Sequence, residues 1–266
     1  MRLTSELVAT GRDCPAKVET FYAGLNQAHH TMYEKELVIE AEAELPEIER
    51  TPRTGITARY PADVVKARGR MSELIASYCI ELDAVVNSKN TAQAEQVIGG
   101  LSDKVQHVGG EIMKASSVAP SLPMSAITAL AAPIKTLASL GIQGAFGFLR
   151  ENWAKDTINR IDAGFEDVCT NMERDLDNSA QEAKDRAGRL VALYQRRYDR
   201  RIKQPVSEDE RKKLLIELSD AGHFYDSVAA DNPAEVFEQA KQIFHKLATW
   251  ASQKAQSSKW KFWSKP

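Results

Sequence analysis

The amino-acid sequence predicts an all-α protein, an elongated bundle of long amphipathic helices with an apolar helical hairpin at its centre. Three observations support this prediction. Apolar residues recur at helical spacing from Ile158 to Ile202, no proline occurs between Ile134 and Gln204, and alternating β-branched runs are nearly absent. With 266 residues, 43% hydrophobic and 27% charged, the chain can bury a substantial core. We therefore expect one elongated helical domain over residues 1–266.

The longest predicted helix covers residues 150–203. Its apolar residues follow one another in steps of three and four, which average about 3.67 residues, the period of a nearly straight helical seam. The seam consists of Ile158, Ile161, Phe165, Val168, Met172, Leu176, Ala180, Ala183, Ala187, Leu190, Tyr194, Tyr198 and Ile202. At ~1.5 Å per residue the helix would be about 80 Å long, so it needs helical partners along its whole length.

The N-terminal part of the chain contains two further predicted helices, over residues 4–45 and 62–86. Pro15 belongs near a helix start, because proline lacks the amide hydrogen that a helix interior uses. Residues 45–61 form the clearest loop, since they include three prolines and a glycine. A further helix is expected over residues 90–114.

Residues 118–149 form an unusually apolar stretch, in which Lys135 is the only formally charged side chain. Three prolines interrupt the stretch, so it is not one membrane span of ~20 residues. We expect a helical hairpin that either is buried at the centre of the bundle, contacts a membrane, or forms a groove for a partner. Its candidate membrane or partner contacts are Leu130, Leu137, Leu140, Ile142, Phe146 and Phe148.

Two helices are predicted after the long one, and we expect both to fold back against it. Pro205 ends the long helix, and Ser207 followed by three acidic residues is typical of a capped helix start. Pro233 marks the start of the last helix.

The C-terminal residues 256–266 are predicted to be a flexible tail in which aromatic residues alternate with lysines. Trp260, Phe262 and Trp263 suit a membrane interface, where aromatic rings lie at headgroup level. A hydrophobic clamp onto the bundle explains the same residues, so both interpretations stay open.

A candidate basic surface lies at the end of the long helix, where residues 189–203 contain six cationic side chains and a single acid, Asp199. We place it at Arg196, Arg197, Arg200 and Arg201. Tyr194 and Tyr198 continue the apolar seam, so the arginines look like an outer helix face rather than a nucleic-acid surface. We do not expect nucleic acid as a partner. Pairing with the acidic run between Glu34 and Glu49 is an alternative.

No motif for catalysis, cofactor binding or metal binding is present. The five histidines lack the helical spacing of a metal site, and the three cysteines form no CxxC pair. The nucleophile-elbow, P-loop and dinucleotide-binding motifs are absent as well. We therefore expect no catalytic, cofactor-binding or metal-binding residues and no enzymatic activity.

Two stretches carry a family resemblance. One is Tyr60-Pro61 followed by Val64, Arg68, Leu74, Tyr78 and Leu82, and the other runs from Asn232-Pro233-Ala234 to His245-Lys246-Leu247. The chain resembles uncharacterised helical proteins of the bacterial cell envelope, many of them predicted lipoproteins. The resemblance implies a location rather than an activity. The N-terminal sequence has no apolar signal-peptide core, so we expect a cytoplasmic protein if it is the true start and a periplasmic one if a signal was removed.

The function expected from these features is that of a helical scaffold or protein-interaction module. The family resemblance makes the bacterial envelope a candidate location for it. It would bind a protein partner or a second copy of itself through helix faces, and a membrane is a further candidate partner. The alternative is a membrane-active protein that inserts residues 118–149, because an apolar hairpin between long helices is similar to the layout of α-helical pore-forming toxins.

Overall fold

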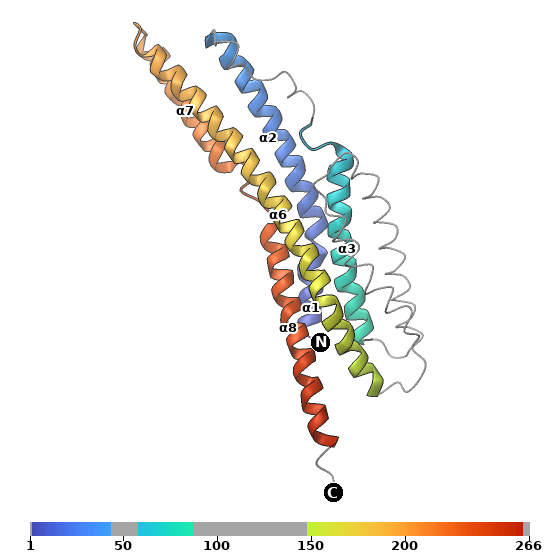
Figure 1. Cartoon of the computed structure of the whole chain (residues 1–266). Coiled ribbons are helices and arrows are strands. Elements are labelled where there is room, and N and C mark those ends of the chain that lie inside the picture. The colour runs from blue at the N-terminus through green and yellow to red at the C-terminus, as the bar shows by residue number, and fades with distance from the viewer. Residues whose placement is uncertain (1, 44–57, 88–147, 263–266) are drawn as a thin grey trace. The chain divides into compact units, whose positions relative to one another are not determined.

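The computed structural model describes residues 2–43, 58–87 and 148–262, with side chains described over 4–39, 58–80, 83–84 and 165–249. These residues form six α-helices and no strand (Figure 1). The helices are α1 (Arg2–Arg12), α2 (Cys14–Ala43), α3 (Ala62–Asn87), α6 (Phe148–Arg201), α7 (Glu208–Ser227) and α8 (Ala234–Phe262). The all-α fold predicted from the sequence is confirmed.

The helix predicted over residues 4–45 is divided at Asp13 into α1 and α2. Pro15 is the second residue of α2, as predicted, where its missing amide hydrogen costs no helical bond. Pro61 directly precedes α3, and its carbonyl oxygen accepts hydrogen bonds from the amides of Val64 and Val65 at 2.9 and 3.0 Å. α3 ends one residue beyond the predicted bound of 86.

α6 has 54 residues, and each of its ends lies two residues from the predicted bounds of 150 and 203. The predicted seam is buried from Phe165 to Tyr194, while Tyr198 and Ile202 are half-buried. The side chains of Ile158 and Ile161 lie outside the described residues. Regular burial at steps of three and four follows from the helical period, so the predicted seam is confirmed from Phe165 to Tyr194 and is only partly buried at its last two residues.

Contacts divide the chain into two compact units. Unit 1 comprises residues 1–19, 66–175 and 233–266, and unit 2 comprises residues 20–65 and 176–232. α2, α3 and α6 each contribute residues to both units.

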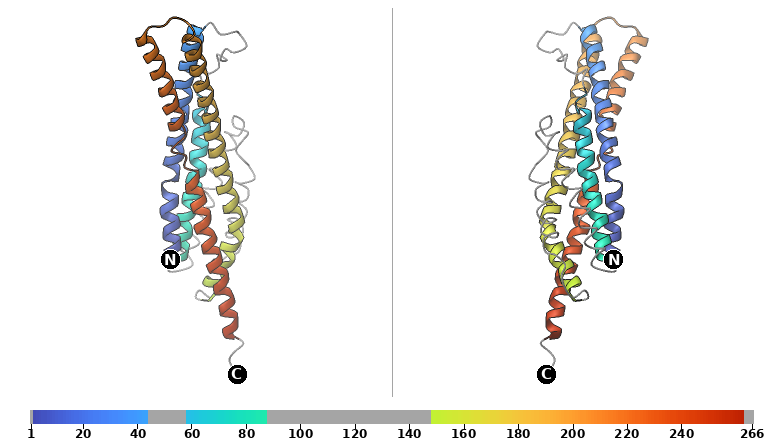
Figure 2. Two further views of the ribbon diagram at one scale, coloured as in Figure 1. Left: turned by 90° about the vertical axis from the view of Figure 1, so that its left-hand side faces the viewer. Right: turned by 90° about the vertical axis from the view of Figure 1, so that its right-hand side faces the viewer.

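Unit 1 has an aromatic core between α3, α6 and α8. The rings of Phe165 and Phe244 stack with centroids 4.4 Å apart, and the Tyr78 ring lies 5.6 and 6.1 Å from them. α8 also packs against α1 and lies beside the N-terminal part of α6 (Figure 2). Gly11 permits α1 to approach α3 closely, because a Cβ atom at Gly11 would lie 3.3 Å from the sulfur of Cys79.

Unit 2 contains parts of α2 and α6 and the whole of α7. The Tyr22 and Tyr60 rings meet edge to face at 5.0 Å, and the Tyr22 hydroxyl lies 3.4 Å from that of Ser179. The Asn26 side chain accepts from the Tyr60 amide and donates to the Tyr60 carbonyl oxygen, both at 2.8 Å. These contacts attach the segment before α3 to α2.

Several predictions lie outside the described residues. They are the helix over residues 90–114, the hairpin up to residue 147, most of the loop over residues 45–61, and residues 263–266 of the tail. For these segments the predictions from the sequence stay predictions. Residues 256–262, predicted as part of a flexible tail, instead belong to α8.

Candidate interaction surface

The four predicted basic residues at the end of α6 divide into two pairs. Arg197 donates to Glu217 of α7 at 2.5 Å, and Arg201 donates to Glu210 of α7. Arg196 and Arg200 are exposed. The charge pattern found in the sequence therefore serves in part to dock α7 on α6.

One stripe of α7 faces α6. Glu210 and Glu217 pair with Arg201 and Arg197 of α6. Leu214, which lies between the two glutamates, and Ala221, which follows them, are buried. The steps of four, three and four residues place all these side chains on one side of the helix. Ile216 lies two residues after Leu214, about 200° around the helix, and therefore points away from α6.

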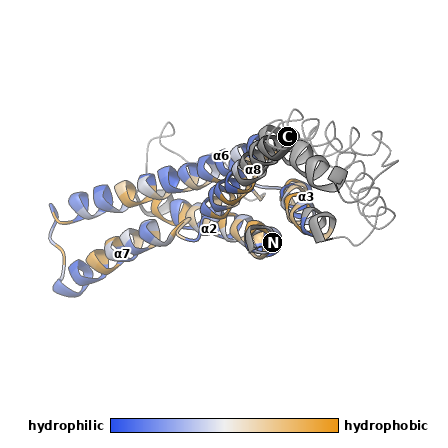
Figure 3. Cartoon of the chain, turned by 90° about the horizontal axis from the view of Figure 1, so that it is seen from below, coloured by the Kyte–Doolittle hydropathy of each residue, from blue (hydrophilic) through white to orange (hydrophobic). Residues whose placement is uncertain are grey.

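Unit 2 holds most of the exposed apolar side chains among the described residues. Of the six large hydrophobic residues that are exposed, two lie on α2, one on α3 and three on α7, namely Leu37, Val38, Ile80, Leu215, Ile216 and Tyr225. Ile216 is the most exposed, at 61%. Hydrophobic positions recur along α7 in Figure 3.

The α7 outer face, as we call it, consists of Asp209, Lys212, Ile216, Asp220 and His223. All five are exposed, and their spacing of three, four, four and three residues keeps them on one side of the helix. The face therefore combines one large apolar side chain with flanking acidic and basic side chains.

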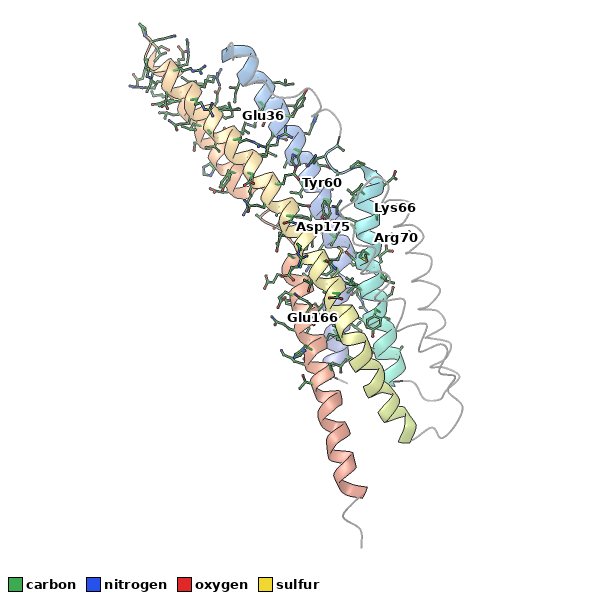
Figure 4. All side chains as sticks on the ribbon, in the orientation of Figure 1. Glu36, Tyr60, Lys66, Arg70, Glu166 and Asp175 are labelled. Atoms are coloured by element: carbon green, nitrogen blue, oxygen red, sulfur yellow. The ribbon has the colours of Figure 1, made fainter. Side chains whose placement is uncertain are left out.

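A buried polar cluster, the Arg186 cluster, joins α6 to α2 within unit 2. Arg186 donates to both carboxylate oxygens of Glu36, with the shorter bond at 2.9 Å, and its third nitrogen lies 3.3 Å from Nδ1 of His29. Glu36 and His29 are only 5% and 4% exposed (Figure 4 labels Glu36). Burial and the charge of Arg186 lower the pKa of His29 to about 4.

Unit 1 has its own buried ion pair. Arg68 donates from Nε and Nη2 to the two carboxylate oxygens of Asp175 at 2.5 and 2.9 Å. Lys241 of α8 contacts both Glu173 and Glu238 at 2.6 Å. The Arg68–Asp175 pair fixes the register of α3 against α6, because breaking it leaves a charge without its partner in a buried site.

The three cysteines are all buried in unit 1. Burial raises the pKa of Cys14 to about 11, and it raises the pKa of Cys79 and Cys169 as well. Protonated, buried thiols are poor nucleophiles and poor metal ligands. In the part of the chain that the structure describes, no group of three or more histidine, cysteine or acidic residues is placed to hold a metal ion.

A groove of about 490 Å³ lies between α6 and α8 in unit 1. It is lined by Phe165, Glu166, Glu238, Lys241, Gln242, Phe244, His245 and Lys246. The two phenylalanines are almost fully buried, and Lys241 already contacts two carboxylates. The two phenylalanine rings therefore contribute almost no exposed surface to the groove, and its most buried cation is already paired.

Neither a known protein family nor a curated protein or solved structure matches this chain. The resemblance to bacterial cell-envelope proteins stays a prediction. Within the described helices, none combines the length and the hydropathy that crossing a membrane requires.

Most of the predicted membrane or partner contacts cannot be placed. Leu130, Leu137, Leu140, Ile142, Phe146 and Trp263 lie outside the described residues. Phe148 belongs to α6, and Trp260 and Phe262 belong to α8, but their side chains lie outside the described part.

Sequence reasoning missed the Arg186 cluster, although the sequence contains a signal for it. His29 and Glu36 lie in helical register with Leu25 and Met32, at steps of four, three and four residues along the buried side of α2. Polar residues on an apolar stripe indicate a buried partner. The prediction from the sequence places Glu36 only in the acidic run between Glu34 and Glu49.

Proposed function

We propose that this chain is a non-enzymatic, helical interaction module that binds a protein helix through unit 2. The observation that supports this most directly is Ile216, a large apolar side chain that is 61% exposed and points away from α6. Full burial of one such side chain contributes about 1.5–3 kcal/mol to association. An amphipathic helix laid along α7 would bury it and would satisfy the flanking charges.

The anchoring of α7 supports the same function. Two arginine–glutamate pairs and two buried side chains hold α7 in one register on α6. A surface that is already ordered loses little conformational freedom when it binds, so even a small contact area gives measurable affinity.

The proposal is tested by photo-crosslinking from the full chain in its own cells. A photoreactive residue at Ile216 should give one protein adduct of defined mass. The matched control is the same residue at Arg211, which is also exposed but lies about 140° around α7. Adducts of equal yield at both positions, or at neither, would contradict binding through this face.

The second candidate function is a membrane-active protein that inserts residues 118–149. The feature that favours it is the single charged residue, Lys135, in this whole stretch. Co-flotation of the purified chain with liposomes, compared with Gly144→Arg, tests it. Binding that the substitution abolishes would support insertion, and a wild-type chain that stays off all vesicles would exclude it.

A further inference from the structure

The charges of the α7 outer face are arranged symmetrically about Ile216. Lys212 precedes Ile216 by four residues and Asp220 follows it by four. Asp209 precedes it by seven and His223 follows it by seven. At a distance of four residues, the basic Lys212 therefore matches the acidic Asp220, and at seven residues Asp209 matches the imidazole of His223, which can donate a hydrogen bond.

All five side chains lie on one exposed side of α7. Separations of four and seven residues return to nearly the same direction in an α-helix. This side is opposite the stripe that contacts α6, where Leu214 and Ala221 are buried and Glu217 pairs with Arg197. The symmetric pattern is thus presented to solvent, where Lys212 lies 3.0 Å from Glu208 of the same helix.

We propose that the outer face of α7 binds the same face of a second copy of this chain, with the two α7 helices antiparallel and the two Ile216 side chains in contact at a two-fold axis. The proposal rests on the proposed function and names its partner. In this arrangement each residue before Ile216 faces the equally distant residue after it. Lys212 then faces Asp220 of the second copy, and Asp209 faces His223 of the second copy, each pair occurring twice as two-fold symmetry requires.

The same charges disfavour the parallel arrangement. Two parallel α7 helices in register would bring Lys212 against Lys212 and Asp220 against Asp220. Like charges in contact oppose association, so the pattern selects the antiparallel pair by repulsion as well as attraction. Charged pairs at such an exposed site contribute mainly orientation, while the central isoleucines contribute the apolar burial.

The expected association is weak. One helix face against another forms an interface at the small end of the range for specific complexes, below about 1,200 Å². We therefore expect a reversible dimer in sedimentation velocity of the purified full chain, measured at low salt from micromolar to millimolar concentrations. Added salt should weaken it, because the flanking pairs are exposed.

The decisive experiment uses charge reversal. Lys212→Asp and Asp220→Lys should each weaken the dimer about ten-fold, because each replaces two attractive pairs by two repulsive ones. The two single variants mixed together should associate as the wild type does, since every contact between them is again of opposite sign. The double variant K212D/D220K should also recover the wild-type association.

Asp226→Lys is the matched control, because it makes the same charge change at an exposed α7 position outside the outer face. It should leave the dimer unchanged. A wild type that stays monomeric throughout, or single variants that do not recover on mixing, would overturn pairing with a second copy. A monomer that still gives a defined Ile216 adduct to another protein in cells would overturn this inference alone and leave the proposed function standing.

Discussion

At the scale of single residues, His29 has the most constrained ionisation state. Its Nδ1 lies 3.3 Å from a guanidinium nitrogen of Arg186, and because a guanidinium only donates, Nδ1 must accept. The proton of neutral His29 is therefore on Nε2, which is buried and has no hydrogen bond to a described residue. Arg186 and Glu182 of α6 face the ring, as does Arg59 from the segment before α3. A second proton would place two cations in contact.

This constraint makes the stability of the chain depend on pH. Burial and Arg186 lower the pKa of His29 from 6.5 to about 4, against a smaller opposing effect of Glu182. The unfolded chain thus binds a proton at His29 near its ordinary pKa, and the folded chain only near the lowered one. Above the ordinary pKa of 6.5, His29 therefore does not lower the free energy of unfolding. As the pH decreases from 6.5 towards about 4, the free energy of unfolding falls by about 3 kcal/mol at most.

Urea denaturation of wild type and His29→Asn over this pH interval measures the effect. Asparagine keeps an acceptor near the position of Nδ1 but does not titrate, so the variant should lose this part of the acid dependence. His30→Asn is the control, because His30 is exposed and lies 3.2 Å from Glu34 on the same helix. Parallel pH profiles for wild type and His29→Asn would show that His29 is not the titrating group.

At the scale of secondary structure, periodicity and capping residues are sufficient to predict α3, α6, α7 and the start of α8, but not the division between α1 and α2 at Asp13. The seam of α6, the proline at the start of α2 and the serine before α7 each act through neighbours within about four residues in sequence. The observed ends of α3 and α6 and the start of α8 lie within two residues of the predicted ones for this reason. The C-terminal end of α8 does not, because α8 continues to Phe262 through residues predicted as a flexible tail from residue 256.

The sequence could not predict which charged residues become buried or which face of α7 stays exposed. Arg186 and Glu36 are 150 positions apart, and Arg68 and Asp175 are 107 apart, so no local pattern pairs them. In α7, several consecutive apolar residues suggest more than one inner face. Only the contact with α6 shows that Leu214 is buried and Ile216 is not.

The cap of α7 gives a prediction at this scale. The Ser207 hydroxyl accepts from the amide of Glu210 at 3.2 Å, and three acidic residues follow in the first turn. Ser207→Ala removes that acceptor, so we expect a loss of about 1 kcal/mol, whereas Ser207→Gly should cost only a few tenths. Hydrogen exchange of the first α7 amides should rise in Ser207→Ala and stay unchanged in Ser219→Ala, an exposed mid-helix control. Equal exchange in both variants would mean that the cap does not stabilise α7.

At the scale of the whole molecule, each compact unit has a buried arginine–carboxylate pair and its own apolar residues. Arg68 and Asp175 pair within unit 1, and Arg186 and Glu36 pair within unit 2. The buried thiols lie in unit 1 and the exposed outer face of α7 lies in unit 2. The buried thiols therefore lie in one unit, and the exposed face proposed to bind a partner lies in the other.

The thiols supply a prediction for the stability of the chain at alkaline pH. Burial raises the pKa of Cys14 from 9.0 to about 11, so the unfolded chain releases this proton first as pH rises. The contribution of Cys14 is fully present below pH 9.0 and is lost as pH rises towards about 11, by about 3 kcal/mol at most. Cys14→Ala should flatten this part of the alkaline denaturation profile relative to wild type.

In the folded protein at mildly alkaline pH, a disulfide reagent should react with the thiols only as fast as the chain opens, because the thiolate is the reactive form. Rapid reaction without denaturant, together with an unchanged profile in Cys14→Ala, would show that these thiols are accessible and that the core of unit 1 admits water.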